Sequence, residues 1–378
     1  MTERYLGADL IFILSLPRSG STLLQRVLGG HPEVGVSSEP WLLLHPAYGR
    51  RSEGILTDYD ADWAALAVNE FLQHYTDGDD AYDDGVRAFA RSIYGNAMRH
   101  AGAHRFVDKT PRYVMIMDDL LRWFPEAKFV FLLRNPLAVL ASIVNTQIQH
   151  DLTALERFRN ELLRGPQALA AGIARLGERA IVMRYEQFVA EPERELGALC
   201  AQLGLEYRAD MLDYRDTRIR GTMQDRTGTA EHHRPAAGRE SGWRQLLNDP
   251  QQLEFARGYL RALGSEPFTA LGYEFAPLEE AVQTAAQSMS PAGYVLPWHV
   301  ALLTPEQKRG ADQLHVDRYR AYRSHSPWLA RLLVARAWLG GVRAAVRYTF
   351  GKGRPGFPAR QDSGEPPAAR AGGRPRNR

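Results

Sequence analysis

The sequence predicts an α/β fold: a parallel sheet covered by helices on both faces and followed by a C-terminal helical extension. Two observations support this prediction. Apolar runs without polar alternation, typical of strands buried on both faces, recur between residues 8 and 183. Segments with apolar residues at helical spacing lie between these runs, and such alternation favours parallel strands joined by crossover helices.

The elements follow in chain order from these patterns. Four strands are expected, over residues 8–15, 105–108, 128–133 and 180–183. Helical spacing predicts helices over residues 21–28, 60–75, 86–100, 114–123, 136–149, 155–177, 192–203 and 250–263. A break is expected near Gly165 and Pro166. The acidic segment Asp77–Asp84 is interpreted as a loop, and residues 208–240 as irregular.

Length and composition exclude several classes of protein. The chain has 378 residues, of which 44% are hydrophobic and 24% charged, and this is an ordinary globular composition. The single cysteine, Cys200, rules out an internal disulfide framework and a Cys-rich zinc module, so no metal is expected. No apolar run approaches the roughly 20 residues that span a bilayer. We therefore expect a cytoplasmic protein.

The balanced net charge of +3 hides an acidic body and a basic tail. Residues 318–378 hold 14 Lys and Arg against 2 Asp and Glu, which leaves a net charge of −9 on residues 1–317. We expect a main domain over residues 1–276, an extension over 277–325, a basic amphipathic helix over 326–350 and a disordered basic tail over 351–378.

The sequence is compatible with two alternative partners for the predicted basic helix. An anionic membrane surface suits it, which would place the protein peripherally at the inner membrane face, and the acidic body suits it as well. Nucleic acid is unlikely because the body would repel it.

The first chemical motif follows the first predicted strand. Residues 17–24 read Pro-Arg-Ser-Gly-Ser-Thr-Leu-Leu and lead into a helix. A turn there lets backbone N–H groups converge on an anion, with hydroxyls and a guanidinium beside them. This is a P-loop-like arrangement, although the paired glycines and the Lys of a Walker A loop are missing.

A second motif, Arg134-Asn135-Pro136, follows the strand at 128–133. Ligands bind at the carboxyl ends of strands in open α/β sheets. Ser142 lies about two helical turns beyond Arg134, so both side chains can face one anion.

Together these motifs resemble the sulfotransferases that use 3′-phosphoadenosine 5′-phosphosulfate (PAPS). Residues 17–24 look like the family's 5′-phosphosulfate loop, and residues 134–142 like its 3′-phosphate motif. Three further segments are similar to the branch that contains tyrosylprotein sulfotransferases and bacterial relatives: His31-Pro32-Glu33-Val34 with Glu39-Pro40, Asp108-Lys109-Thr110-Pro111, and Arg184-Tyr185-Glu186. The resemblance covers roughly residues 10–275.

The resemblance implies in-line transfer of a sulfuryl group from PAPS to an acceptor hydroxyl. By this resemblance, Glu39, eight residues beyond His31, corresponds to the catalytic base of that branch. Lys109 corresponds to the cation that contacts the leaving phosphate, and Arg18 to a second catalytic cation. His31 is interpreted as a structural residue at a helix end. The implied donor-binding residues are Arg18, Ser19, Gly20, Ser21, Thr22, Leu23, Arg134, Ser142, Tyr185 and, by a looser motif match, Arg239.

The sequence leaves three matters open. The acceptor is not identified, and Trp63 and Phe71 could line its cleft or belong to the core. A P-loop nucleotide kinase remains an alternative, although the missing Walker A Lys argues against it. A non-catalytic nucleotide-binding, membrane-associated protein is the other alternative, and Glu39 and Lys109 argue against it.

Overall fold

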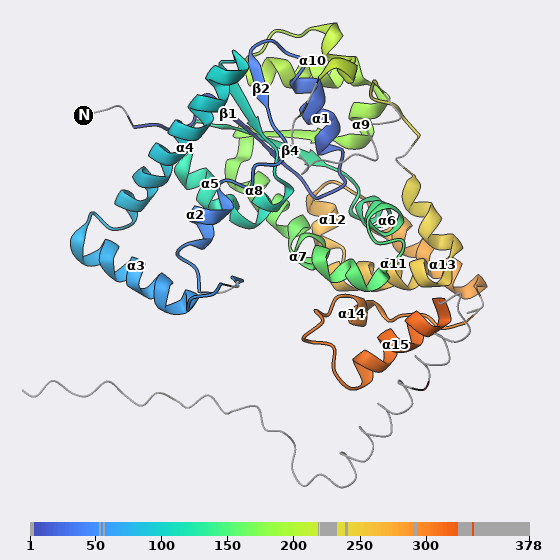
Figure 1. Ribbon diagram of the computed structural model, residues 1–378. Helices are drawn as coiled ribbons and strands as arrows, with labels where there is room; N and C mark the ends of the chain where they lie inside the picture. Colours follow the sequence, from blue (N-terminus) through green and yellow to red (C-terminus); the bar gives the residue numbers. More distant parts are fainter. Residues whose placement is uncertain are drawn as a thin grey trace, which may run out of the picture. The chain divides into compact units, whose positions relative to one another are not determined.

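A computed structural model describes residues 4–52, 54–55, 57–217, 219, 233–238, 241–289, 293–323 and 335. Its sheet has five parallel strands in the spatial order β2-β3-β1-β4-β5 (Figure 1). The strands are β1 (Leu10–Leu14), β2 (Val34–Val36), β3 (Arg105–Asp108), β4 (Lys128–Leu133) and β5 (Ala180–Arg184).

Helices and short 3₁₀ turns connect and follow these strands. The α-helices of the first 200 residues are α1 (Ser21–Leu28), α2 (Leu44–Tyr48), α3 (Ala61–Tyr75), α4 (Asp79–Ala101), α5 (Met117–Trp123), α6 (Pro136–Thr146), α7 (Arg159–Leu163), α8 (Gly165–Leu176), α9 (Tyr185–Ala190) and α10 (Pro192–Leu203). Those that follow are α11 (Pro250–Leu263), α12 (Glu266–Ala270), α13 (Ala276–Ser288), α14 (Trp298–Ala301) and α15 (Ala311–Arg323). The 3₁₀ turns include η1 (Pro111–Ile116), η2 (Leu152–Phe158), η4 (Ala209–Leu212) and η6 (Gly242–Asn248).

Alternate residues of β1 face two different hydrophobic layers. Ile11 and Ile13 belong to a fully buried cluster with residues of α1, α9 and α10. Phe12 points the other way, where its ring stacks on Phe129 at a centroid distance of 5.5 Å and contacts Tyr113 of η1 edge-on. Burial of both faces explains why β1 and β4 read as continuous apolar runs.

The structure confirms the predicted α/β fold and differs from the predicted elements in several places. The predicted helices 114–123 and 155–177 begin as 3₁₀ turns, η1 and η2. Strand β2 was not predicted, because three residues, Val34–Val36, are too few for a pattern. The acidic segment Asp77–Asp84 is not a loop throughout, because α4 begins at Asp79. Carboxylates in a first helical turn are favourable since they face the positive end of the helix dipole. The predicted break at Gly165 is confirmed, as α7 ends at Leu163 and α8 begins at Gly165.

The chain divides into two compact units, Met1–Lys308 and Arg309–Arg378. The first continues past residue 276, because α13 and α14 pack against α11. The predicted basic helix and tail, 326–350 and 351–378, lie outside the described residues except for Ala335. Within the described ranges, no helix has the length and apolar character needed to cross a membrane.

Candidate active site

The carboxyl ends of all five strands meet at one edge of the sheet, and each carries one predicted site segment. Across the sheet, Glu39 follows β2, Lys109 follows β3, the 17–24 loop follows β1, Arg134 follows β4 and Tyr185 follows β5. Parallel strands deliver their ends to the same side, so motifs up to 160 residues apart become neighbours.

The loop after β1 has the backbone of a tight anion-binding turn. Gly20 is the N-cap of α1 with φ +88°, a left-handed conformation that favours glycine. A Cβ at Gly20 would lie 2.5 Å from Tyr185 Cδ2, so the tyrosine ring packs directly on the glycine. Arg18 also has a positive φ, +67°, which is uncommon for a residue with a side chain. Such strain in a non-glycine residue is typical of functional sites.

Two buried hydroxyls of this strand and loop lack hydrogen-bond partners among the described residues. Ser15 directly follows β1 and Ser19 lies in the turn, and both side chains are fully buried. A buried polar atom without a partner is costly, and a ligand oxygen at the N-terminus of α1 would satisfy it. The loop therefore fits a bound phosphate or sulfate group.

The second predicted anion motif converges on the same loop. Arg18 Nε donates to Ser142 Oγ at 3.2 Å, and Arg134 Nη1 donates to the carbonyl of Arg18 at 2.7 Å. The Arg134 guanidinium also lies over the Tyr185 ring, 4.4 Å from its centroid. Burial lowers the pKa of Arg134 from its usual value. The structure thus brings Arg18, Arg134, Ser142 and Tyr185 together.

Lys109 and Glu39 form an ion pair beside the loop. Lys109 Nζ lies 2.7 Å from Glu39 Oε1 and donates to Thr22 Oγ1 at 3.3 Å. The lysine is fully buried, whereas 18% of the Glu39 side chain is exposed. A buried ammonium group needs such a partner. Lys109 therefore stands between the anion-binding loop and a carboxylate that solvent can reach.

Trp41 holds the second oxygen of this carboxylate. Its indole Nε1 donates to Glu39 Oε2 at 3.2 Å, and its backbone has a positive φ of +54°. The Arg112 guanidinium lies 5.3 Å from the Trp41 ring and pairs through Nε with Glu161 Oε1 at 2.8 Å. Burial raises the pKa of Glu161. With Lys109 on one oxygen and Trp41 on the other, the Glu39 carboxylate has a fixed orientation.

Asp108 ties the two segments that carry Lys109 and Glu39. The buried Asp108 carboxylate accepts hydrogen bonds from Tyr94, Tyr113 and Thr110 hydroxyls, and Tyr113 in turn accepts from the Leu43 backbone N–H at 3.1 Å. Burial raises the pKa of Asp108 to about 6. This network links the end of β3 to the segment between β2 and α2.

Other predicted residues take different places. Leu23 packs against the hydrophobic cluster beneath α1, which leaves only its backbone to face the loop. His31 is buried, and its Nδ1 accepts from the Glu33 N–H, as a structural residue would. Arg239 lies outside the described residues. Neither Trp63 nor Phe71 is a core residue, since they are 69% and 57% exposed.

Three side chains that support the site were not predicted from the sequence: Tyr94, Tyr113 and Arg112. Tyr94 lies on α4, and no feature of the sequence connects that helix with Asp108. The other two follow Lys109 closely, so proximity to the motif was the one available signal. Among the described residues, no cluster of His, Cys, Asp and Glu has the composition of a metal site.

Comparison with known proteins gives this geometry its context. A family model described as "Sulfotransferase family" matches residues 9–209. The nodulation protein NoeE of Sinorhizobium fredii is 33% identical over 219 residues, which are 52% of this chain and 50% of that protein. A putative protein-tyrosine sulfotransferase of Caenorhabditis briggsae is 25% identical, over 55% of this chain and 70% of that one.

A solved structure is similar as well. The sulfotransferase domain from the curacin biosynthetic pathway matches 74% of this chain and 98% of its own length, with 21% identity and a TM-score of 0.43. This chain spans about half the length of NoeE. The family model covers more than half of the chain and includes all five strands at full length. The chain belongs to the sulfotransferase family.

Proposed function

We propose that this protein transfers a sulfuryl group from PAPS to an acceptor hydroxyl. The observation that supports the proposal best is the buried Lys109 placed between Thr22 of the loop and the partly exposed Glu39. In this arrangement the loop can bind the donor, the cation can stabilise the leaving group, and the carboxylate can remove the proton of the acceptor.

The loop and its neighbours would bind the two ends of the donor. Backbone N–H groups at the start of α1, with the hydroxyls of residues 19, 21 and 22, suit the 5′-phosphosulfate. Arg134 and Ser142 suit the 3′-phosphate, for which a guanidinium offers a planar pair of donors. The packing of Tyr185 on Gly20 keeps this part of the site rigid.

Glu39 and Lys109 have complementary roles in the proposed reaction. The acceptor oxygen forms a bond to sulfur as the bond from sulfur to the bridging phosphate oxygen breaks, in line. Glu39 takes the proton of the acceptor hydroxyl, and Lys109 with Arg18 stabilises the charge gained by the leaving phosphate. The residues supply this stabilisation without a metal ion. Because Lys109 Nζ also donates to Glu39 Oε1, the leaving phosphate would share or displace that contact.

Two measurements test the proposal. Calorimetric titration should show tighter binding of adenosine 3′,5′-bisphosphate, the nucleotide product, than of ADP. Incubation with radiolabelled PAPS and a panel of hydroxyl compounds should then transfer label to at least one of them. The panel contains a tyrosine peptide, glycosides, a fatty alcohol and 2-naphthol. A preference for ATP with magnesium, or no binding of the bisphosphate, would overturn the proposal.

A further inference from the structure

Large exposed hydrophobic side chains concentrate in one short part of this protein. Among the described residues, ten such side chains are exposed, and seven of them lie between residues 59 and 93. They are Tyr59, Trp63, Leu66, Phe71, Tyr75, Phe89 and Ile93. Single exposed hydrophobic residues are common on proteins, but a contiguous group is typical of an interaction surface.

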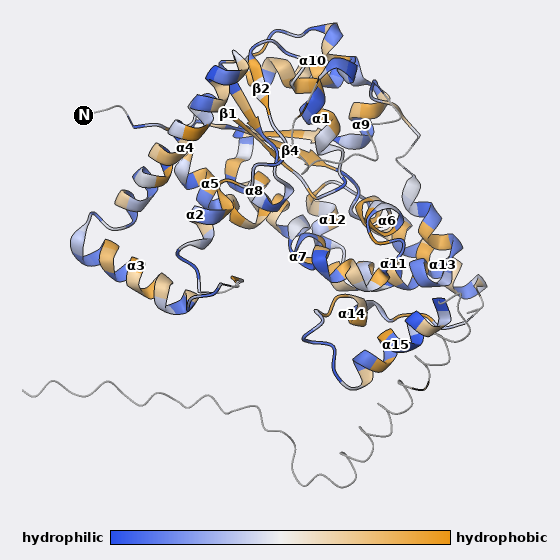
Figure 2. Ribbon diagram, viewed as in Figure 1, coloured by the Kyte–Doolittle hydropathy of each residue, from blue (hydrophilic) through white to orange (hydrophobic). Residues whose placement is uncertain are grey.

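Four of these residues form a stripe along α3, which we name the outer face of α3: Trp63, Leu66, Phe71 and Tyr75. At 100° per residue, Trp63, Phe71 and Tyr75 fall within about 120° of the helix circumference, and Leu66 widens this arc to about half of it. Apolar and polar residues both occur along α3 (Figure 2). The Phe71 and Tyr75 rings stack at a centroid distance of 5.7 Å. The stripe is about 18 Å long, the length of roughly three turns of a partner helix.

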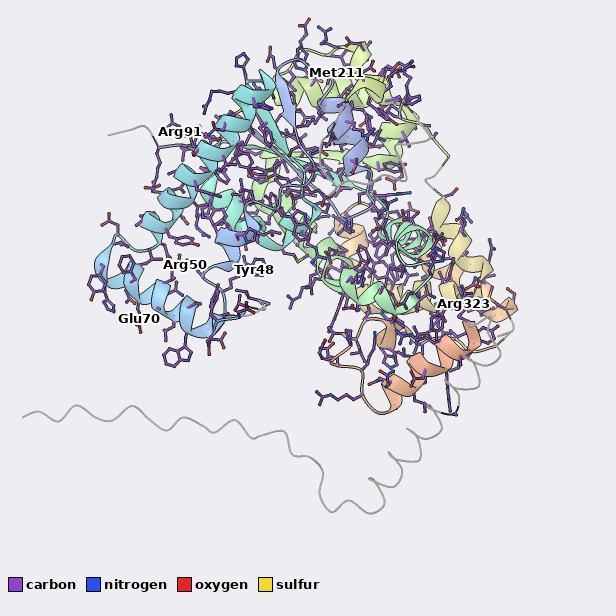
Figure 3. All side chains as sticks on the ribbon, in the orientation of Figure 1. Tyr48, Arg50, Glu70, Arg91, Met211 and Arg323 are labelled. Atoms are coloured by element: carbon purple, nitrogen blue, oxygen red, sulfur yellow. The ribbon has the colours of Figure 1, made fainter. Side chains whose placement is uncertain are left out.

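The rest of the structure holds α3 with this face outward. Only Ala65 and Leu72 of the helix are buried, and both lie on the opposite side. Arg50 Nε donates to Asn69 Oδ1 at 2.8 Å, and its Nη2 pairs with Asp79 at the start of α4 at 2.6 Å. Figure 3 shows Arg50 and Glu70 on either side of α3. The aromatic rings are therefore exposed on a helix that is attached to the rest of the structure.

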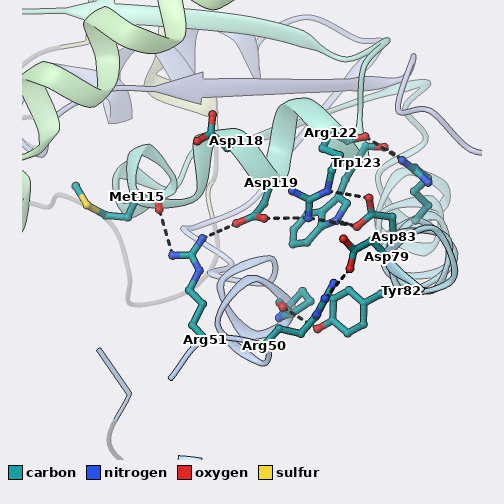
Figure 4. A network of polar contacts seen from close by, with 12 residues as sticks. Arg50, Arg51, Asp79, Tyr82, Asp83, Met115, Asp118, Asp119, Arg122 and Trp123 are labelled. Carbon is teal, nitrogen blue, oxygen red and sulfur yellow. Dashed lines mark hydrogen bonds and ion pairs between the residues drawn. The ribbon is translucent and has the colours of Figure 1, made fainter. Parts of the chain in front are cut away.

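The base of this helical pair is fastened to the body of the domain. Arg51 pairs with Asp119 of α5 at 2.5 Å and donates to the Met115 carbonyl (Figure 4). Asp83 of α4 accepts from Arg122 at 2.8 Å and from Trp123 Nε1 at 2.7 Å. These contacts fix α4 against α5, so the outer face of α3 is presented on a stable support.

The segment that carries the outer face is rich in acidic residues. Residues 57–86 contain nine Asp and Glu and no Lys or Arg. Several of these acids are satisfied within the protein, but Asp58, Asp62, Glu70 and Asp77 have no ion-pair partner among the described residues, and all four are exposed. A surface with this charge attracts cations and repels anionic membranes and nucleic acids.

We propose that the outer face of α3 docks a basic amphipathic helix of another protein. The aromatic stripe would receive the apolar side of that helix, and Asp62 and Glu70 would pair with cations at its edge. A second copy of this chain is a poorer occupant, because antiparallel pairing about the middle of α3 would bring two Glu70 carboxylates together. The inference does not depend on the proposed sulfuryl transfer.

A synthetic helical peptide of leucine and lysine in amphipathic order, with a fluorescent label, is the probe. The matched control peptide carries glutamate in place of lysine. Binding is measured by anisotropy to the full-length protein, to Trp63→Ser/Phe71→Ser and to Asp62→Asn/Glu70→Gln. The matched control variant is Tyr207→Ser, which removes an exposed aromatic residue elsewhere.

We expect the lysine peptide to bind and the glutamate peptide not to bind. Loss of the two aromatic residues should weaken binding by about tenfold or more, as expected of central interface residues. Loss of the two carboxylates should weaken it by several fold and reduce its dependence on salt. Tyr207→Ser should bind as wild type does, and all variants should keep the circular dichroism spectrum and melting behaviour of wild type if they are folded.

Four outcomes would overturn the inference. These are no binding of the lysine peptide, equal binding by the aromatic double variant, equal binding of the glutamate peptide, and a solution dimer that the double variant abolishes. The last outcome would assign the face to a second copy. Flotation with anionic phosphatidylserine vesicles gives a further check, because retention that depends on Trp63 and Phe71 would assign the face to a membrane instead.

Discussion

Glu39 is the residue on which the proposed chemistry depends, because its carboxylate is held on both oxygens and still reaches solvent. Replacement by Gln keeps the size of the side chain but removes the proton acceptor. We expect Glu39→Gln to lower turnover by roughly a hundredfold to ten-thousandfold, the usual contribution of a general base. Binding of adenosine 3′,5′-bisphosphate should change little, since Glu39 belongs to the acceptor side.

Glu33→Gln is the matched control, because Glu33 is exposed and lies six residues earlier in the chain. It should retain full turnover with whichever hydroxyl compound wild type sulfates. A fully active Glu39→Gln variant would exclude Glu39 as the base, whereas an inactive wild type would instead reject the proposed reaction.

Trp41 offers a second test at the scale of one residue. Trp41→Phe keeps an aromatic ring beside Arg112 but removes the N–H that holds Glu39 Oε2. We expect a lower kcat with an unchanged KM for PAPS, because the carboxylate loses its orientation and the donor loop is untouched. The exposed Trp63→Phe serves as control. An equal effect of both substitutions, or a change in KM alone, would argue against this role.

Asp108 should make stability depend on pH in a particular direction. Its pKa is about 6 in the folded protein against a usual value of 3.8, so the folded state binds more protons between these values. The free energy of unfolding therefore falls as pH rises from about 4 to 6, by on the order of 3 kcal/mol from this group. Asp108→Asn should remove that slope.

Denaturant unfolding of wild type and Asp108→Asn across this pH range measures the difference between the two slopes. An amide oxygen can still accept from Tyr94 and Tyr113, so the variant should fold. Parallel curves for the two proteins would show that the Asp108 pKa is not raised in the folded state.

At the scale of elements, the start of α1 is the most constrained part of the site. Gly20→Ala would force an unfavourable φ and drive a Cβ into the Tyr185 ring. Gly102→Ala, at the end of α4, imposes a left-handed φ of +65° with no neighbour within 4 Å, so it should cost about 1 kcal/mol of stability. Gly20→Ala should cost more and also weaken adenosine 3′,5′-bisphosphate binding, as read by calorimetry. Equal stability of the two variants would refute the clash.

The elements also show what a sequence can predict. Strands β1 and β4 were predictable since burial on both faces leaves an uninterrupted apolar run. Strand β2 was not, because Gly35 interrupts a segment of three residues, and the start of α4 was hidden by its acidic first turn. The five site segments were predictable by motif, but the contacts of Tyr94 and Arg112 depend on tertiary packing between distant helices.

At the scale of the whole molecule, the described C-terminal segments complete the first unit. Trp298 packs between Phe255 and Tyr259 of α11, and a Cβ on Gly258 would lie 2.3 Å from its ring. A chain that stops at Phe275 loses this contact, and loss of one buried Trp costs about 3–5 kcal/mol. We expect that chain to melt at a lower temperature or to aggregate. A chain that stops at Lys308 should match the full-length protein in calorimetry, and equal melting of the two shortened chains would contradict the expectation.

The strand order has a consequence for how the protein could change its substrate. The residues proposed to bind the donor nucleotide follow β1, β4 and β5, whereas Glu39, proposed for the acceptor side, follows the edge strand β2. Lys109, proposed for the leaving phosphate, follows β3 between them. The donor side and the acceptor side of the site meet at Thr22 of α1, which Lys109 contacts from the end of β3. Substitutions around β2 could therefore alter which acceptor hydroxyl enters the site without disturbing the bound nucleotide. The fold places the donor site, which is the same for every acceptor, and the acceptor site, which can vary, on different strands of one sheet.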